Sequence, residues 1–174
     1  MHRVASAPER TFDVVLNPPA VAMAWLGRHR DHTAVAVPGV ALDAGEMLVA
    51  IELATVCGSD VHTTEGRRDA PTPLVLGHEA VGRIVTMNGD SRAVDGTPLR
   101  PGSRVVWSIM ASCAACDRCM RGLPQKCRSL KKYGHERMAD HWELSGGFAT
   151  HAHLRAGTAV VAVDDAIPAA VLAP

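Results

Sequence analysis

The chain has 174 residues, of which 47% are hydrophobic, a length that suits one domain with one core and leaves no room for a second full domain. Lys plus Arg and Asp plus Glu balance at 18 each, which argues against a nucleic-acid partner, since such proteins carry a basic surplus. The longest apolar stretches are far shorter than the ~20 residues that cross a bilayer, so we expect no membrane partner.

Short apolar segments alternate with turn residues along most of the chain. Residues 1–20 are spotted with proline and weakly patterned, so we expect a weakly ordered segment there. Beyond it, Gly, Pro and Asp clusters divide runs that predict strands. The expected strands are 21–26, 33–37, 46–53, 80–86, 104–109, 148–154 and 159–163. Short helices are expected at 57–64 and 166–173, with a turn at 118–122. This spacing favours a mainly β fold, a mostly antiparallel barrel or sandwich.

The segment 46–53 shows a clear alternation of apolar and polar residues. Its apolar positions share one face of a strand: Met47, Val49, Ile51 and Leu53. Glu46 and Glu52 fall on the opposite face. The expected strand leads directly into Cys57.

Four of the five cysteines lie close together, at Cys113, Cys116, Cys119 and Cys127. The spacing lets one lobe, at about residues 110–130, place four thiolates around a tetrahedral zinc ion with Zn–S bonds of about 2.3 Å. A closed set of four protein ligands indicates a structural zinc, because a catalytic metal needs an open position.

Disulfides are the alternative for these cysteines, and they fit poorly. Bridges among Cys113, Cys116 and Cys119 would close small, strained rings. The first eight residues show no apolar stretch typical of a signal peptide. Free thiols indicate a reducing compartment, so we expect a cytoplasmic protein.

The fifth cysteine opens the segment Cys-Gly-Ser-Asp-Val-His at residues 57–62. At the start of a short helix, backbone N–H groups and the helix dipole favour the thiolate of Cys57. Ser59 and His62 are three residues apart, so on a helical turn they share a face and can pass a proton from hydroxyl to imidazole. Taken alone, Ser59 and Asp60 also fit helix capping, and His62 fits a solvated imidazole.

A second segment with ligand chemistry is Gly77-His78-Glu79. The imidazole of His78 and the thiolate of Cys57 are both zinc ligands, and Glu79 offers a carboxylate oxygen beside them. The tripeptide is weak evidence by itself, because the chain holds nine histidines. Together with the four-cysteine lobe, these residues predict two zinc sites.

Five motifs together resemble zinc-containing medium-chain alcohol dehydrogenases, in the order and spacing of that family and over about residues 45–165. They are Cys57-Gly-Ser-Asp-x-His62, Gly77-His-Glu79-x-x-Gly82, Pro101-Gly-Ser-Arg-Val105, the four-cysteine lobe and Gly146-Gly-Phe-Ala149. The resemblance implies a GroES-like β-barrel catalytic domain over residues 21–174, which in the family precedes a Rossmann domain that binds NAD(P). The stretch 71–79 and the ending 167–174 look most like the branch proposed to act in phosphonate metabolism.

Carried over by position, the resemblance assigns a role to each residue of the two clusters. Cys57 and His78 match ligands of the catalytic zinc, and Glu79 matches the adjacent acid, which in some members ligates the metal. Asp60 matches the acid that orients the zinc-binding imidazole. The cysteines of the lobe match the ligands of the structural zinc.

The reaction implied by the resemblance is oxidation of a small-molecule alcohol to a carbonyl. Zinc supplies Lewis-acid catalysis, and the hydride passes to NAD(P) in the complete enzyme. Ser59 and His62 match the relay that carries the hydroxyl proton toward solvent.

The chain departs from the family pattern in its cofactor and ligand sets. No Gly-x-Gly-x-x-Gly follows an expected strand, so the dinucleotide fingerprint of the Rossmann domain is absent. The family's third protein ligand commonly lies near or beyond Pro174, although Glu79 could take its place. We therefore expect a fragment, a truncated reading frame or half of a split enzyme, without turnover on its own. Family members are often homo-oligomers, so we expect a homo-oligomer or association with a separate cofactor domain.

Two other function classes compete with the dehydrogenase. One is a non-enzymatic zinc-binding scaffold or interaction module built on the same barrel. The other is a zinc-ribbon nucleic-acid binder, against which the neutral charge and the aromatic content of 3% both weigh.

Overall fold

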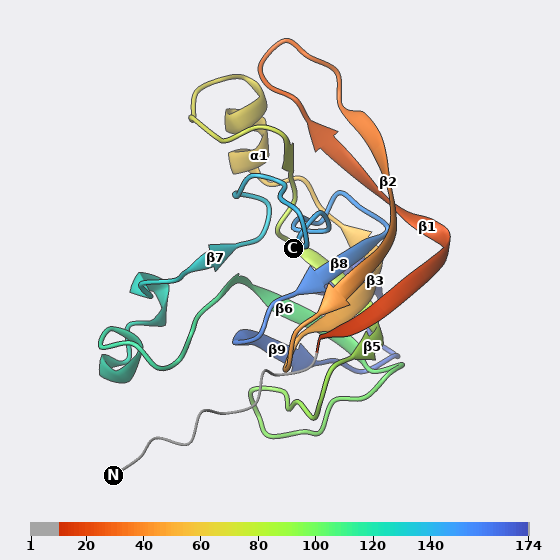
Figure 1. Ribbon diagram of the computed structural model, residues 1–174, viewed down its shortest axis with the longest axis vertical. Coiled ribbons are helices and arrows are strands. Elements are labelled where there is room, and N and C mark those ends of the chain that lie inside the picture. Colours follow the sequence, from red (N-terminus) through yellow and green to blue (C-terminus); the bar gives the residue numbers. More distant parts are fainter. Residues whose placement is uncertain (1–10, 174) are drawn as a thin grey trace.

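The computed structural model describes residues 11–173, and the fold is mainly β, as predicted (Figure 1). Its strands are β1 (Phe12–Trp25), β2 (Thr33–Leu42), β3 (Met47–Ala54), β4 (Leu74–Val75), β5 (Ala80–Met87), β6 (Arg104–Ala111), β7 (Lys131–Lys132), β8 (His151–Leu154) and β9 (Thr158–Ala162). Its helices are α1 (Gly58–Thr64), α2 (Ala169–Leu172) and the short 3-10 helices η1 (Cys119–Arg121) and η2 (Pro124–Lys126). Within the described range, no helix has the length and apolar character needed to cross a membrane.

Two antiparallel sheets form a curled half-barrel. One sheet has the strand order β2-β1-β4, and the other has the order β7-β6-β5-β3-β8, with β9 pairing with β6. In Figure 1 the long β1-β2 hairpin runs along one side of the molecule. The segment with η1, η2 and β7 extends away on the opposite side, so the four-cysteine lobe stands apart from the sheets (Figure 1).

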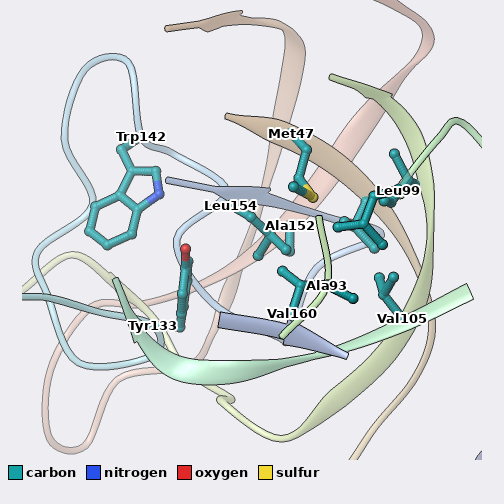
Figure 2. Packing of buried hydrophobic residues seen from close by; sticks show 11 residues of the cluster. Met47, Ala93, Leu99, Val105, Tyr133, Trp142, Ala152, Leu154 and Val160 are labelled. Atoms are coloured by element: carbon teal, nitrogen blue, oxygen red, sulfur yellow. The ribbon is translucent and has the colours of Figure 1, made fainter. Parts of the chain in front are cut away.

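Strand β3 lies between β5 and β8 in the larger sheet, and its first three residues are buried. Met47 and Val49 belong to the hydrophobic cluster drawn in Figure 2. Leu48 points to the opposite face and belongs to a second cluster with residues of β1 and β2. The face of β3 that carries Leu48 is therefore apolar at this point, whereas the sequence pattern had placed only the acidic Glu46 and Glu52 on that face. Because β3 is held between β5 and β8, the chain enters α1 from a fixed position.

Glu46 precedes β3 and is buried, with 2% of its surface exposed. Its Oε2 accepts hydrogen bonds from Nε2 of His153 at 2.7 Å and from the N–H of Asp43 at 3.0 Å. Its Oε1 lies 2.9 Å from Nε of Arg155. Burial alone would raise the pKa of Glu46, but these hydrogen bonds and the charges of His153 and Arg155 bring it below its ordinary value of 4.5. A buried carboxylate thus joins the start of β3 to the end of β8.

The segment 1–20, expected to be weakly ordered, is a strand from Phe12 onward, and the first ten residues lie outside the described part of the chain. The ladder of β1 with β2 shifts its register after Val15, in the stretch that holds Pro18 and Pro19. Proline cannot donate a hydrogen bond to a ladder and is tolerated at such irregular positions. Strand β1 therefore continues through a proline-containing sequence that is not typical of a strand.

Gly82 lies where β5 pairs with β3, and a side chain there would collide with the backbone oxygen of Ala50. We expect Gly82→Ala to lower the free energy of unfolding by about 1–3 kcal/mol, because the two strands would have to separate. Denaturant titration of the zinc-loaded chain measures the change. Gly58→Ala is the control, since nothing lies within 4 Å of its added Cβ. An equal loss in both variants would contradict the steric explanation.

Candidate metal centres

Three side chains with metal-binding chemistry meet beside the start of α1. Sγ of Cys57, a ring nitrogen of His78 and a carboxylate oxygen of Glu79 lie within 4.8 Å of one another. Cys57 is the N-cap of α1 after β3, whereas His78 and Glu79 lie between β4 and β5. The fold thus brings together two segments that are separate in the sequence. We call this group the three-residue site.

Asp60 connects α1 to the loop that carries His78. The carboxylate is buried, and it accepts hydrogen bonds from the N–H of Cys57 at 3.0 Å and from the N–H of Gly77 at 3.2 Å. Burial alone would raise the pKa of Asp60, but the nearby His78 and these two N–H groups lower it. Asp60 therefore caps the helix as an ionised group and stands directly behind the His78 ring.

The His78 ring has one nitrogen toward Asp60 and the other toward α1. Nδ1 is buried and faces Oδ1 of Asp60 at 3.6 Å, slightly beyond hydrogen-bonding distance. Nε2 lies 3.4 Å from Oγ of Ser59. Asp60 raises the pKa of His78 against the opposing effect of burial. The hydroxyl and N–H of Ser59, followed by His78, lower the pKa of Cys57 and so favour its thiolate.

The donor chemistry of the three-residue site fits a zinc ion. Glu79 is held there by Thr55, whose hydroxyl donates to Oε2 at 3.0 Å. A thiolate, an imidazole and a carboxylate are all zinc ligands, and three protein ligands leave a fourth position for substrate. A ligating imidazole whose other nitrogen faces a carboxylate is a common arrangement in metal sites.

Ser59 and His62, the two members of the expected proton relay, both lie on α1. Ser59 faces the ring of His78, whereas His62 is exposed on α1. No hydrogen bond joins the two side chains among those found for residues 11–173. The proton relay between them stays a prediction.

His135 lies beside the three-residue site, although no motif indicates it. Its ring centroid is 4.8 Å from that of His78, with the planes tilted by 57°. The backbone reaches this position because Gly134 packs on the loop: an added Cβ there would lie 2.6 Å from the oxygen of Gly77. Burial lowers the pKa of His135. The sequence shows it only as one of nine histidines.

The sulfurs of the four-cysteine lobe form a second cluster, with all four Sγ atoms within 4.8 Å of one another. Sγ of Cys116 lies 3.5 Å from Sγ of Cys119, and Sγ of Cys127 lies 3.4 Å from Sγ of Cys113. All five cysteines of the chain are free thiols, so the structure does not adopt the disulfide alternative.

The electrostatics of the lobe favour a bound cation. Backbone N–H groups, first that of Arg128, lower the pKa of Cys116 to about 6, and the N–H of Cys113 lowers that of Cys127 to about 7. Desolvation and the neighbouring sulfurs raise the pKa of Cys119 to about 12. Four adjacent thiolates repel one another unless a divalent ion offsets their charge, and zinc suits four sulfur ligands. The lobe therefore fits a structural zinc.

The sequence is similar to a known family and to several curated proteins. A family model described as the alcohol dehydrogenase GroES-like domain matches residues 43–165. D-arabinitol dehydrogenase 1 from Uromyces fabae is 32% identical over 139 residues, covering 80% of this chain and 36% of that protein. D-altritol 5-dehydrogenase from Agrobacterium fabrum is 31% identical over 121 residues, covering 69% of this chain and 32% of that protein.

The fold also has counterparts among solved structures. An alcohol dehydrogenase from Thermotoga maritima superposes with a TM-score of 0.76 and 33% identity, covering 88% of this chain and 43% of that one. The chain spans about a third of the length of the two curated relatives named above.

Proposed function

The chain belongs to the alcohol dehydrogenase GroES-like domain family, and from this premise we propose that it is the catalytic domain of a zinc-dependent alcohol dehydrogenase. The complete enzyme oxidises an alcohol to a carbonyl and transfers a hydride to NAD(P). No residue of this chain is assigned to NAD(P), because its sequence holds no dinucleotide fingerprint. The chain supplies the ligands of the proposed metal ion and the residues beside which the alcohol would bind.

The observation that carries the proposal is the convergence of Cys57, His78 and Glu79 within 4.8 Å. A structural role alone would not need a thiolate, an imidazole and a carboxylate with an open fourth position. The buried Asp60 behind His78 supports the same conclusion, since its carboxylate faces Nδ1 of the ring at 3.6 Å and leaves Nε2 for a metal.

The chemistry of the site follows from its side chains. A zinc ion bound there supplies Lewis-acid polarisation, which makes the hydroxyl of an alcohol easier to deprotonate. The hydroxyl of Ser59, beside Nε2 of His78, would accept that proton and release its own hydroxyl proton. No hydrogen bond joins Ser59 to His62 among residues 11–173, so the transfer from Ser59 to the exposed His62, which would release the proton to solvent, is part of the proposal.

The relatives favour polyols as the first substrates to test. Two of them are named for dehydrogenation of D-arabinitol and D-altritol. We therefore propose a small alcohol with several hydroxyl groups as the substrate class. The link to phosphonate metabolism stays a prediction.

The alternative function is a non-enzymatic scaffold, which the self-contained four-cysteine lobe favours. Zinc content separates the two functions. We expect about two zinc ions per unsubstituted chain. Cys57→Ala and His78→Ala should each hold about one, because either substitution removes a ligand of the three-residue site. Elemental analysis after gel filtration measures this. His62→Ala is the matched control, since this exposed imidazole is not a ligand. One zinc per unsubstituted chain, retained by Cys57→Ala, would support the scaffold instead.

A further inference from the structure

His135 contributes a ring to the three-residue site that the proposed reaction does not use. Its centroid lies 4.8 Å from that of His78, yet its nitrogens are outside the group of ligand atoms that meet within 4.8 Å. The ring thus stands next to the proposed metal ligands without belonging to them.

The tautomer of His135 follows from a hydrogen bond between its ring and the backbone. Nδ1 lies 2.7 Å from the backbone oxygen of Tyr133. A carbonyl oxygen only accepts, so Nδ1 carries the proton and the neutral ring has its lone pair on Nε2. Tyr133 itself is buried, with 1% of its surface exposed, and its ring packs edge-on against Trp142. The acceptor that orients the imidazole is therefore part of the core.

Nε2 of His135 is an acceptor without a partner in the described part of the chain. No hydrogen bond to this atom is formed by residues 11–173, and it is not one of their fully buried unpartnered atoms, so it is at least partly exposed. The core fixes the ring from one side, and Gly134 fixes its backbone against the loop of His78 from the other. An acceptor held in this way is preorganised for a hydroxyl donor.

We propose that His135 is a substrate-positioning residue, whose Nε2 accepts a hydrogen bond from a second hydroxyl of the alcohol and makes the site prefer vicinal diols. The inference rests on the proposed function, because the first hydroxyl must bind at the three-residue site. In a vicinal diol the second hydroxyl is on the adjacent carbon, close enough to reach a ring that contacts His78. An alcohol with a single hydroxyl has no second donor for Nε2 of His135.

Binding of two matched alcohols to the zinc-loaded chain tests the inference. We use 2,3-butanediol and 2-butanol, which differ by one hydroxyl, and follow the ring nitrogens of His78 and His135 by long-range proton–nitrogen NMR. The His78 resonances should shift with both alcohols, whereas Nε2 of His135 should shift with the diol alone. We expect the diol to bind about fivefold more tightly, the ratio that one net hydrogen bond supplies.

Variants at this position separate substrate contact from packing. His135→Phe should weaken binding of the diol to the level of 2-butanol, and His135→Gln, which keeps an acceptor, should retain part of the preference. His151→Phe, a half-buried histidine on β8, is the control and should keep the full preference. Zinc content should stay the same in all three.

Four results would overturn the inference. A His135→Phe variant that loses zinc, or binds both alcohols more weakly by the same factor, would show a packing role. Equal binding of both alcohols by the unsubstituted chain, with His78 responding to each, would overturn this inference and leave the proposed function intact. A His78 ring that responds to neither alcohol would overturn both.

Discussion

Replacing Cys116 and Cys119 together with alanine is expected to remove one zinc ion per chain and to unfold the four-cysteine lobe while the sheets stay folded. Neither η1 nor η2 holds a buried residue, so the lobe has no apolar core of its own. Structural zinc contributes about 10–16 kcal/mol of binding free energy in small zinc-dependent folds. Without the metal, the remaining contacts are too few to order this segment.

Limited trypsin digestion, combined with zinc analysis, measures this effect. The lobe carries four trypsin sites, at Arg118, Arg121, Lys126 and Arg128. These should be cut rapidly in the double variant and slowly in the unsubstituted chain. Met120→Ala is the control, because this residue of η1 is 74% exposed and its side chain holds no metal. Trypsin resistance equal to that of the unsubstituted chain would contradict a metal-dependent lobe.

Glu46→Ala is expected to lower the free energy of unfolding by about 3–5 kcal/mol, because it leaves buried polar partners uncompensated. His153 is fully buried and would lose its 2.7 Å hydrogen bond. Arg155 would lose its partner at 2.9 Å. Denaturant unfolding at neutral pH measures the loss. Glu65→Ala, which breaks the exposed pair with Arg67, is the control and should change little.

The cost of Glu46→Ala should depend on pH in a defined direction. The folded chain lowers the pKa of Glu46 below 4.5, so the unfolded chain binds the proton more readily. The stabilisation is therefore fully present above pH 4.5 and is lost as the pH falls through the folded pKa. The difference between the variant and the unsubstituted chain should narrow in acid. A difference that widens in acid would contradict an ionised Glu46.

The four-cysteine lobe and most strands could be predicted from the sequence, because each depends on residues that are close together along the chain. Cysteine spacing is enough to predict the four-cysteine lobe, and alternation together with turn residues predicts most strands of the mainly β fold. The start of α1 was expected at Cys57 and lies one residue later, at Gly58. The two-residue strands β4 and β7 are too short for alternation to appear.

The remaining contacts depend on the pairing of distant strands, which periodicity does not reveal. Glu46 meets His153 because Leu48 of β3 pairs with that residue of β8. The alternation placed Glu46 correctly opposite Met47, but it gave no sign that this face is also buried. His135 reaches the three-residue site through the close approach of Gly134 to the loop before β5, which no pattern in the sequence indicates.

X-ray absorption at the zinc edge tests most directly whether Cys57 and His78 bind the same metal ion. The Cys116→Ala/Cys119→Ala variant is the sample of choice, because the lobe no longer contributes a tetrathiolate signal. We predict one zinc per chain with one sulfur neighbour at about 2.3 Å and nitrogen or oxygen neighbours, including one imidazole, at about 2.0–2.2 Å. A variant without zinc, or a zinc shell that lacks either the sulfur or the imidazole, would contradict the three-residue site.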